Sequence, residues 1–141
     1  MNTTTSDIRV GNLMTIDPVV IRADAPASEA ERLLKAHRVS GLPVVDGEAT
    51  AGVISQTDLM VARSSGMISG NWDRVLVRHL MTAPAVTVHT GTTLARAAQL
   101  MVTRHIHRLV VVDDEDVPIG VVSSLDLLRV LVKDADIGPD A

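Results

Sequence analysis

The chain has 141 residues, 46% of them hydrophobic, with a formal net charge of −4 and no cysteine. That length and apolar content suit one ordinary domain with its own core, and the lack of cysteine excludes disulfides and thiolate sites. The acidic balance and the single aromatic residue, Trp72, argue against a basic face or an aromatic stacking platform for nucleic acid.

The sequence also lacks targeting and membrane signals. Its opening residues, MNTTTSDIRV, contain no apolar signal region, and no later stretch reaches the ~18 uninterrupted apolar residues of a membrane span. We therefore expect a soluble, cytoplasmic protein with neither a membrane nor a nucleic acid as partner.

The chain contains an internal duplication. When it is aligned with itself, the LMT at 13–15 falls on the LMT at 80–82, and the register holds to the end of the two VVD runs. After one extra residue in the second copy, GVISQTDL at 52–59 falls on GVVSSLDL at 120–127. The duplication divides the chain into a polar tail (1–7), a first repeat (8–62), a connector (63–76), a second repeat (77–133) and a polar tail (134–141).

The first repeat begins with a strand-like apolar run at 19–21. A helix is predicted next, with Pro26 in its opening turn and an apolar stripe of Ala27, Ala30 and Leu34. The runs LPVVD and AGVIS then predict a hairpin, in which Pro43 indicates an edge position or the start of a strand. A closing helix is expected to begin near Thr57.

The connector is rich in Ser and Gly, which predicts the most mobile loop of the chain, and the two polar tails are expected to be frayed. The second repeat has the same order as the first: a strand at 86–88, a helix, a hairpin formed by LVVVD and IGVVS, and a helix from about Leu125. The apolar stripe of its first helix is Leu94, Ala97, Ala98 and Met101. Each repeat is therefore β-α-β-β-α.

A repeat of about 60 residues has a thin core of its own. We therefore predict an α+β fold in which two β-α-β-β-α repeats pack sheet to sheet about a pseudo-twofold axis, with a ligand cleft on that axis.

Each closing helix is preceded by a serine three residues before an aspartate, namely Ser55 and Asp58 in the first repeat and Ser123 and Asp126 in the second. This is the spacing of a capping box. An aspartate at a helix N-terminus is held ionised and keeps lone pairs that can accept two vicinal hydroxyls. Capping and ligand binding are therefore compatible.

The motifs NLMT and HLMT, the runs HRVSGLPVVD and HIHRLVVVDDEDVPIGVVSSLDLL, and the doubled G-h-h-S-x-x-D pattern resemble the tandem CBS-domain pair, or Bateman module. The resemblance covers about residues 8–133, and the repeats are similar to those of the nucleotide-sensing gamma subunit of AMP-activated kinase. It implies a stand-alone regulatory protein that binds an adenine nucleotide (AMP, ADP or ATP) in the cleft and modulates a separate, unidentified protein. Together with an apolar surface on the last helix, it favours a homodimer; the apolar residues are Leu127, Leu128, Leu131 and Val132.

By the same resemblance, Asp58 and Asp126 accept hydrogen bonds from ribose hydroxyls, and the hydroxyls of Ser55, Thr57 and Ser123 lie close to ribose or phosphate. Leu125 stands where Thr57 would have its counterpart, which predicts a weaker or empty second site.

The resemblance also assigns a purine-contacting segment to each repeat, through backbone and aliphatic side chains. These segments comprise Val39, Ser40, Gly41, Leu42 and Pro43 in the first repeat, and Ile106 and Leu109 in the second. Gly41 leaves room for a base, whereas Arg108 at the equivalent position does not.

A basic cluster formed by Arg104, His105, His107 and Arg108 is the candidate phosphate-binding site. Arginine offers a planar fork of donors, and a nearby phosphate favours protonated histidine. The resemblance puts His107 and Arg108 first. The alternative is that these side chains are solvated or pair with the acidic turn at 113–116.

Other chemistry has no support in the sequence. His105 and His107 lack a third metal ligand at suitable spacing, the DDED turn lacks the pattern of an EF-hand, and no nucleophile motif is present, so we expect neither a metal, nor a catalytic cofactor, nor enzymatic activity. Two alternatives stay open: a structural or protein-interaction module whose serine–aspartate pairs only cap helices, and a binder of S-adenosylmethionine, NAD or a cyclic dinucleotide.

Overall fold

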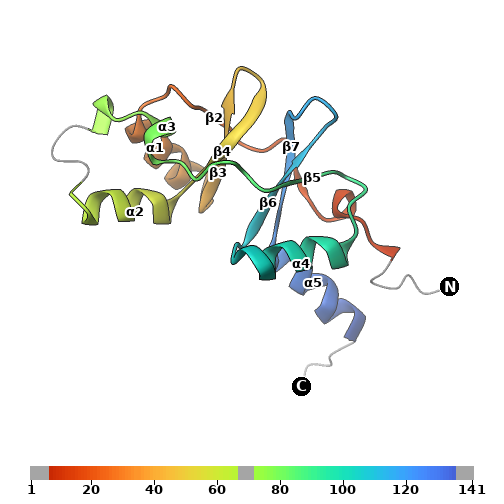
Figure 1. Ribbon diagram of the computed structural model, residues 1–141. Helices are drawn as coiled ribbons and strands as arrows, with labels where there is room; N and C mark the ends of the chain where they lie inside the picture. Colours follow the sequence, from red (N-terminus) through yellow and green to blue (C-terminus); the bar gives the residue numbers. More distant parts are fainter. Residues whose placement is uncertain (1–6, 67–71, 136–141) are drawn as a thin grey trace. The chain divides into compact units, whose positions relative to one another are not determined.

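The computed structural model describes residues 7–66 and 72–135, which form two compact units (Figure 1). The Asp58 unit comprises Pro18–Val86 and Asp114–Pro118. The Asp126 unit comprises Met1–Asp17, Thr87–Asp113 and Ile119–Ala141. The predicted polar tails lie almost entirely outside the described residues.

The Asp58 unit is built on a three-stranded sheet in the order β2-β3-β4, in which β3 is parallel to β2 and antiparallel to β4. Figure 1 shows α1 and α2 together on one side of this sheet. Its elements in chain order are β2 (Ile21–Arg22), α1 (Ala27–His37), β3 (Gly41–Asp46), β4 (Ala49–Ser55), α2 (Gln56–Ser64), η3 (Trp72–Arg74) and α3 (Val77–Leu80).

The core of the Asp58 unit forms where the apolar stripe of α1 meets the sheet. Ala27, Ala30 and Leu34 are buried as the helical period predicts, and Leu42 and Val44 of β3 belong to the same cluster. Pro26 is the N-cap of α1 and therefore lies just before the helix, not inside its first turn as predicted.

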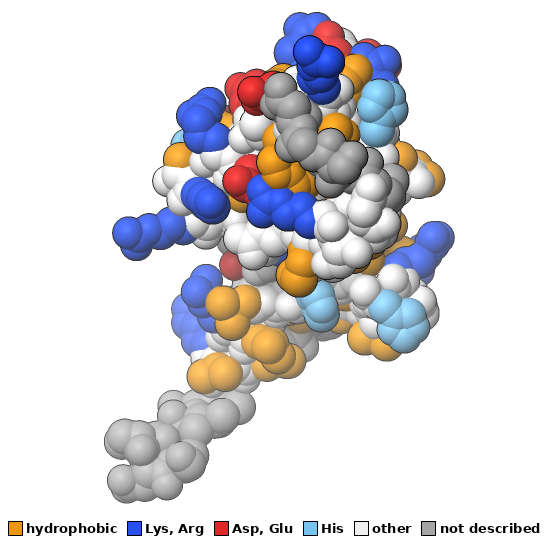
Figure 2. Space-filling view, turned by 90° about the vertical axis from the view of Figure 1, so that its left-hand side faces the viewer, with side chains coloured by type: hydrophobic (Ala, Val, Ile, Leu, Met, Phe, Trp, Pro, Cys, Tyr) orange, Lys and Arg blue, Asp and Glu red, His pale blue; other side chains and the backbone are white. Residues whose placement is uncertain are grey.

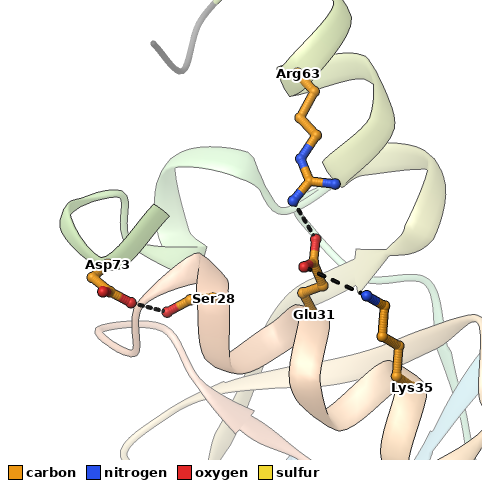
Figure 3. Close-up of polar contacts among 5 residues, drawn as sticks. All are labelled: Ser28, Glu31, Lys35, Arg63 and Asp73. Atoms are coloured by element: carbon orange, nitrogen blue, oxygen red, sulfur yellow. Dashed lines mark hydrogen bonds and ion pairs between the residues drawn. The ribbon is translucent and has the colours of Figure 1, made fainter. Parts of the chain in front are cut away.

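The second half of the predicted connector packs against the same core. Trp72 is partly buried there, and the guanidinium of Arg63 in α2 lies 4.5 Å from the centre of its ring. Ser28 of α1 donates a hydrogen bond to Asp73, while Glu31 pairs with Arg63 and with Lys35 (Figure 3). Residues 67–71, at the centre of the predicted mobile loop, lie outside the described residues.

The Asp126 unit contains a four-stranded sheet in the order β1-β7-β6-β5, with β1 antiparallel to β7 and β5 parallel to β6. Helix α4 packs against β6 and against α5. The elements of this unit are η2 (Val10–Asn12), β1 (Thr15–Ile16), β5 (Thr87–Val88), α4 (Leu94–Arg104), β6 (Arg108–Val112), β7 (Pro118–Ser123) and α5 (Ser124–Ala135).

The opening segment of each repeat packs on the sheet of the other repeat, a feature that the sequence analysis did not anticipate. Thr15 pairs with Val121 on the edge of β7, and the main chain of Thr82 bridges that of Val53 on the edge of β4. The preceding valines of the two segments, Val10 and Val77, are fully buried. The compact units therefore contain parts of both sequence repeats.

Two glycines allow this close approach. A Cβ built on Gly52 would lie 2.6 Å from the carbonyl oxygen of Thr82, and one on Gly120 would lie 2.5 Å from the sulfur of Met14. Real Cβ atoms do not come this close to other heavy atoms, so a side chain at Gly52 would force a main-chain shift, whereas one at Gly120 would force the flexible end of Met14 to move.

The structure confirms the predicted α+β class and the β-α-β-β-α order of both repeats. The prediction of an edge position for Pro43 is wrong, because β3 is the central strand and Pro43 is its third residue. Proline lacks a main-chain N–H, but β2 does not need one at Pro43, because β2 pairs only with Val44 and Val45. Val53, opposite Pro43, directs both of its main-chain groups away from β3, toward Thr82.

We predict that Gly52→Ala lowers the free energy of unfolding by about 2–3 kcal/mol, because the new methyl group meets a main-chain oxygen that cannot move by itself. Gly120→Ala costs about 1 kcal/mol, because the thioether of Met14 is flexible and can yield. Urea denaturation measures both, with Gly91→Ala as the control, since nothing lies within 4 Å of a Cβ there. Equal losses for the two variants would contradict this account.

Candidate functional site

The carboxylate of Asp58 lies at the N-terminus of α2, in a complete capping box. Its Oδ2 accepts hydrogen bonds from the main-chain N of Ser55 at 2.8 Å and from Ser55 Oγ at 3.0 Å. In return, Ser55 Oγ accepts from the main-chain N of Asp58 at 3.1 Å. The cap predicted from the sequence is therefore present, and it engages only one of the two carboxylate oxygens.

The second oxygen of Asp58 faces the opening segment of the second repeat. Thr82 donates from its Oγ1 to Asp58 Oδ1 at 3.0 Å. The Thr82 main chain is fixed by two hydrogen bonds with Val53, of 3.0 and 2.9 Å. This contact was not predicted from the sequence; the only signal for it was that the LMT motif recurs once in each repeat, as the Ser-x-x-Asp motif does.

The second capping box is looser. Asp126 Oδ2 accepts from the main-chain N of Ser123 at 2.8 Å, and Ser123 Oγ accepts from the main-chain N of Asp126 at 3.2 Å. Asp126 Oδ1 lies 3.5 Å from Nη1 of Arg129, one helical turn further along α5. This ion pair was not predicted either, although the i,i+3 spacing on a helix indicates it.

The predicted purine segment of the first repeat lies directly beside its capping box. Gly41 pairs with Ser55 across the β3–β4 ladder, and the main-chain N of Gln56 donates to the carbonyl of Ser40 at 2.9 Å. Val39 is 37% exposed, so its side chain can meet a ligand. Leu42 is buried in the core and can offer only main-chain groups.

The same arrangement recurs in the second repeat. The main-chain N of Ser124 donates to the carbonyl of His107 at 2.8 Å, which holds the start of β6 beside the start of α5. Ile106 is half-buried, whereas the Leu109 side chain is fully buried and belongs to the core. In each repeat the structure thus brings the capping box and the predicted purine segment together.

The basic cluster spans the turn between α4 and β6. Arg104 ends α4, and Arg108 begins β6. Between them, His105 has a left-handed backbone with φ of 55°, as does Arg38 at the same point of the first repeat. The side chains of Arg104, His105 and His107 are exposed, and that of Arg108 is half-buried.

Thr57 is exposed in the first turn of α2, and Leu125, at the corresponding position of α5, is 53% exposed. The hydroxyl of Thr57 therefore faces outward on the same turn as Asp58.

Other features of the described residues lie apart from these boxes. A pocket of about 400 Å³ between α1 and α2 is lined by residues such as Leu34, Leu59 and Met60, and none of the predicted site residues lines it. In the part of the chain that the structure describes, no group of three His, Asp or Glu side chains is placed to hold a metal ion. No helix within the described ranges has the length and apolarity to cross a membrane.

The family model for the CBS domain matches the chain twice, at residues 10–65 and 77–133. The chain belongs to the CBS domain family. Each match contains one Ser-x-x-Asp box and one predicted purine segment, so the duplicated geometry described above is that of two CBS repeats.

Curated relatives share these repeats within longer proteins. The uncharacterized protein MJ1232 of Methanocaldococcus jannaschii is 28% identical over 127 residues, which are 89% of this chain and 40% of that protein. An inosine-5'-monophosphate dehydrogenase of Korarchaeum cryptofilum is 28% identical over 119 residues, covering 84% of this chain and 23% of the enzyme. The chain therefore spans less than half the length of either relative.

Solved CBS pairs have the same fold. CBSX2 in complex with AMP matches with a TM-score of 0.77 and 28% identity, covering 91% of this chain and 98% of that chain; CBSX2 is a CBS-pair protein from Arabidopsis thaliana. The CBS pair of MJ0100, in complex with 5'-methylthioadenosine and S-adenosyl-L-methionine, matches with a TM-score of 0.80 and 24% identity, over 89% and 97% of the two chains.

We predict that Ser55→Ala lowers the free energy of unfolding by about 1–2 kcal/mol, because its hydroxyl both accepts from the Asp58 main chain and donates to the Asp58 carboxylate. Ser123→Ala should cost about 1 kcal/mol or less, since its hydroxyl makes only the first of these bonds within the described residues. Chemical denaturation gives both values, and Thr57→Ala on the exposed face of α2 is the control. A larger loss for Ser123→Ala would show that the second box is the tighter one.

Proposed function

We propose that this CBS pair is a regulatory protein that binds an adenine nucleotide, AMP, ADP or ATP, and modulates a separate protein partner. The observation that carries the proposal is the duplicated Ser-x-x-Asp box. Each box lies beside the start of a strand, β3 or β6, whose main-chain groups can contact a ligand. The AMP complex of CBSX2, a CBS pair of nearly the same length at 28% identity, supports an adenosyl ligand.

The ribose is proposed to bind at the two helix N-termini. Asp58 and Asp126 accept hydrogen bonds from its hydroxyls, because each carboxylate has lone pairs beyond those used in capping. The hydroxyls of Ser55, Thr57 and Ser123 lie on the same turns and are proposed to face the ribose or the phosphates.

The purine is proposed to lie against the starts of β3 and β6. Val39, Ser40, Gly41, Leu42 and Pro43 form the first segment, with Leu42 and Pro43 limited to main-chain contact by their burial. Ile106 and Leu109 form the second segment. Aliphatic and main-chain groups suffice here, since the whole chain has one aromatic residue.

The phosphates are proposed to meet the turn between α4 and β6. Arg104 and Arg108 supply planar donor forks, and His105 and His107 supply ring N–H donors. Three of these four side chains are exposed, so reaching an anion requires little rearrangement.

The proposed mechanism is linkage without catalysis. A ligand that binds one state of the protein more tightly shifts the population toward that state, and the partner responds to the shift. The similarity to an enzyme is compatible with this role, because the chain matches only 23% of the length of the dehydrogenase.

S-adenosylmethionine is a second candidate ligand, favoured by the MJ0100 complex, which contains it together with 5'-methylthioadenosine. Both candidates carry the same adenosyl group, so the ribose and purine contacts proposed above apply to either. They differ at the basic turn, which favours the negative phosphates of a nucleotide over a sulfonium.

We predict that calorimetric titration with AMP, ADP and ATP gives saturable binding, and that Asp58→Ala or Asp126→Ala weakens binding at the altered site at least about tenfold. Asp58→Asn is the matched variant: its amide oxygen keeps the bond from the Ser55 main chain, so the cap survives while the second acceptor is lost. S-adenosylmethionine and NAD, titrated in parallel, rank the ligands. The absence of heat with every ligand would leave a structural or interaction module as the better description.

The proposal includes a homodimer that uses the outer face of α5. Leu125, Leu128, Leu131 and Val132 are 50–56% exposed along one side of this helix, and the patch is visible in the lower part of Figure 2. Leu127 was predicted to share this surface, but it is buried, because the helical period turns it toward the core.

We predict that Leu128→Glu converts a dimer to a monomer in light scattering coupled to size-exclusion chromatography, since it places a charge in the apolar patch. Lys133→Glu, an exposed charge change on the same helix, should leave the mass unchanged. A wild-type mass of one chain at all concentrations would remove the dimer from the proposal.

A further inference from the structure

The two aspartates proposed to bind ribose differ in how much of their hydrogen-bonding capacity is already used. An ionised carboxylate offers about four acceptor positions. At Asp58, Ser55 occupies two of them through its main-chain N and its Oγ, and Thr82 Oγ1 occupies a third. The vicinal diol of a ribose donates two hydrogen bonds, so Asp58 is one acceptor short while Thr82 is in place.

Asp126 has no such competitor among the described residues. Its hydrogen bond from the Ser123 main chain uses one acceptor position, and its other oxygen faces Arg129 at 3.5 Å, an ion pair whose guanidinium side chain is 70% exposed. Thr15 occupies the position equivalent to Thr82, paired with Val121 as Thr82 is with Val53, yet no hydrogen bond joins it to Asp126 in the described part of the chain.

We infer that Thr82 is a specificity-determining residue of the Asp58 site. A ligand can donate both ribose hydroxyls to Asp58 only if it displaces the Thr82 side chain. This inference rests on the proposed function, since it concerns how the same aspartate receives a sugar. The two CBS repeats then differ in affinity because of Thr82, independently of the Thr57 and Leu125 difference seen in the sequence.

The displacement needs only a side-chain rotation. The Thr82 main chain is held by its two bonds with Val53 and by the close approach of its carbonyl to Gly52, so it stays on the edge of β4. The Thr82 side chain is exposed, and its hydroxyl can turn to water without leaving a buried donor unpaired. The ligand therefore competes with one exposed hydrogen bond and not with the fold.

This competition also distinguishes ligands by their sugar. A nucleotide with one hydroxyl, such as a 2'-deoxynucleotide, needs one acceptor and fits beside Thr82 without displacing it. A ribonucleotide needs two acceptors and must displace it. The Thr82 hydroxyl thus lowers the preference of the Asp58 site for ribose over deoxyribose.

The test is calorimetric titration of the 141-residue chain carrying Asp126→Asn with AMP and with 2'-deoxy-AMP, so that the measured binding comes from the Asp58 site. Thr82→Val, which has the same shape without the hydroxyl, should tighten AMP binding by about fivefold and leave 2'-deoxy-AMP nearly unchanged. Thr82→Ser restores the hydroxyl and should bind both ligands as the parent does. Thr15→Val, the equivalent change in the other LMT segment, should also match the parent, and thermal unfolding verifies that each variant is folded.

The outcomes separate this inference from the proposed function. An unchanged or weaker affinity of Thr82→Val for AMP, or an equal gain with 2'-deoxy-AMP, overturns the inference while nucleotide binding stands. Failure of the parent and of every variant to bind either ligand overturns the proposed function and the inference with it. Binding by Thr82→Val where the parent shows none supports both.

Discussion

The close approach of a main-chain segment to a glycine underlies the rest of this structure. At Gly52 the carbonyl of Thr82 comes within 2.6 Å of where a Cβ would stand, and at Gly120 the side chain of Met14 does the same. A methyl group at Gly52 would push the Thr82 main chain off the strand edge, whereas one at Gly120 would first displace the flexible side chain of Met14. Each compact unit therefore has one such glycine, where a segment of the other repeat packs on the edge of its sheet.

The packing of each LMT segment on the other repeat also determines what surrounds the carboxylate of Asp58. The capping box with Ser55 is local and forms from residues three apart, so it orients one carboxylate oxygen without help from the rest of the chain. The other oxygen faces Thr82, which reaches it only because the LMT segment lies along β4. A stabilising contact between distant segments thus occupies a position that a sugar is proposed to use. The two duplicated sites share the capping-box pattern, but the second box is looser and its aspartate keeps more free acceptors.

Short-range patterns predicted much of the fold and part of the site. The helical stripe of Ala27, Ala30 and Leu34 is buried, and the serine–aspartate pairs form caps, because both depend on neighbours within one or two helical turns. The edge assignment of Pro43 failed because strand order is not a local property. The contacts of Thr82 and Arg129 were missed, the first because it joins distant segments, the second because only the caps were considered.

The sequence by itself determined the duplication, the β-α-β-β-α order of each repeat, the CBS resemblance and the positions of both capping boxes. Periodicity, motif spacing and composition suffice for these features, since each depends on the order of residues within a short stretch. Only the tertiary structure decided that each LMT segment completes the sheet of the other repeat, and that Thr82, but not Thr15, hydrogen-bonds the neighbouring aspartate. Those outcomes depend on small differences in packing between segments far apart in the chain, which two nearly identical sequence motifs do not reveal.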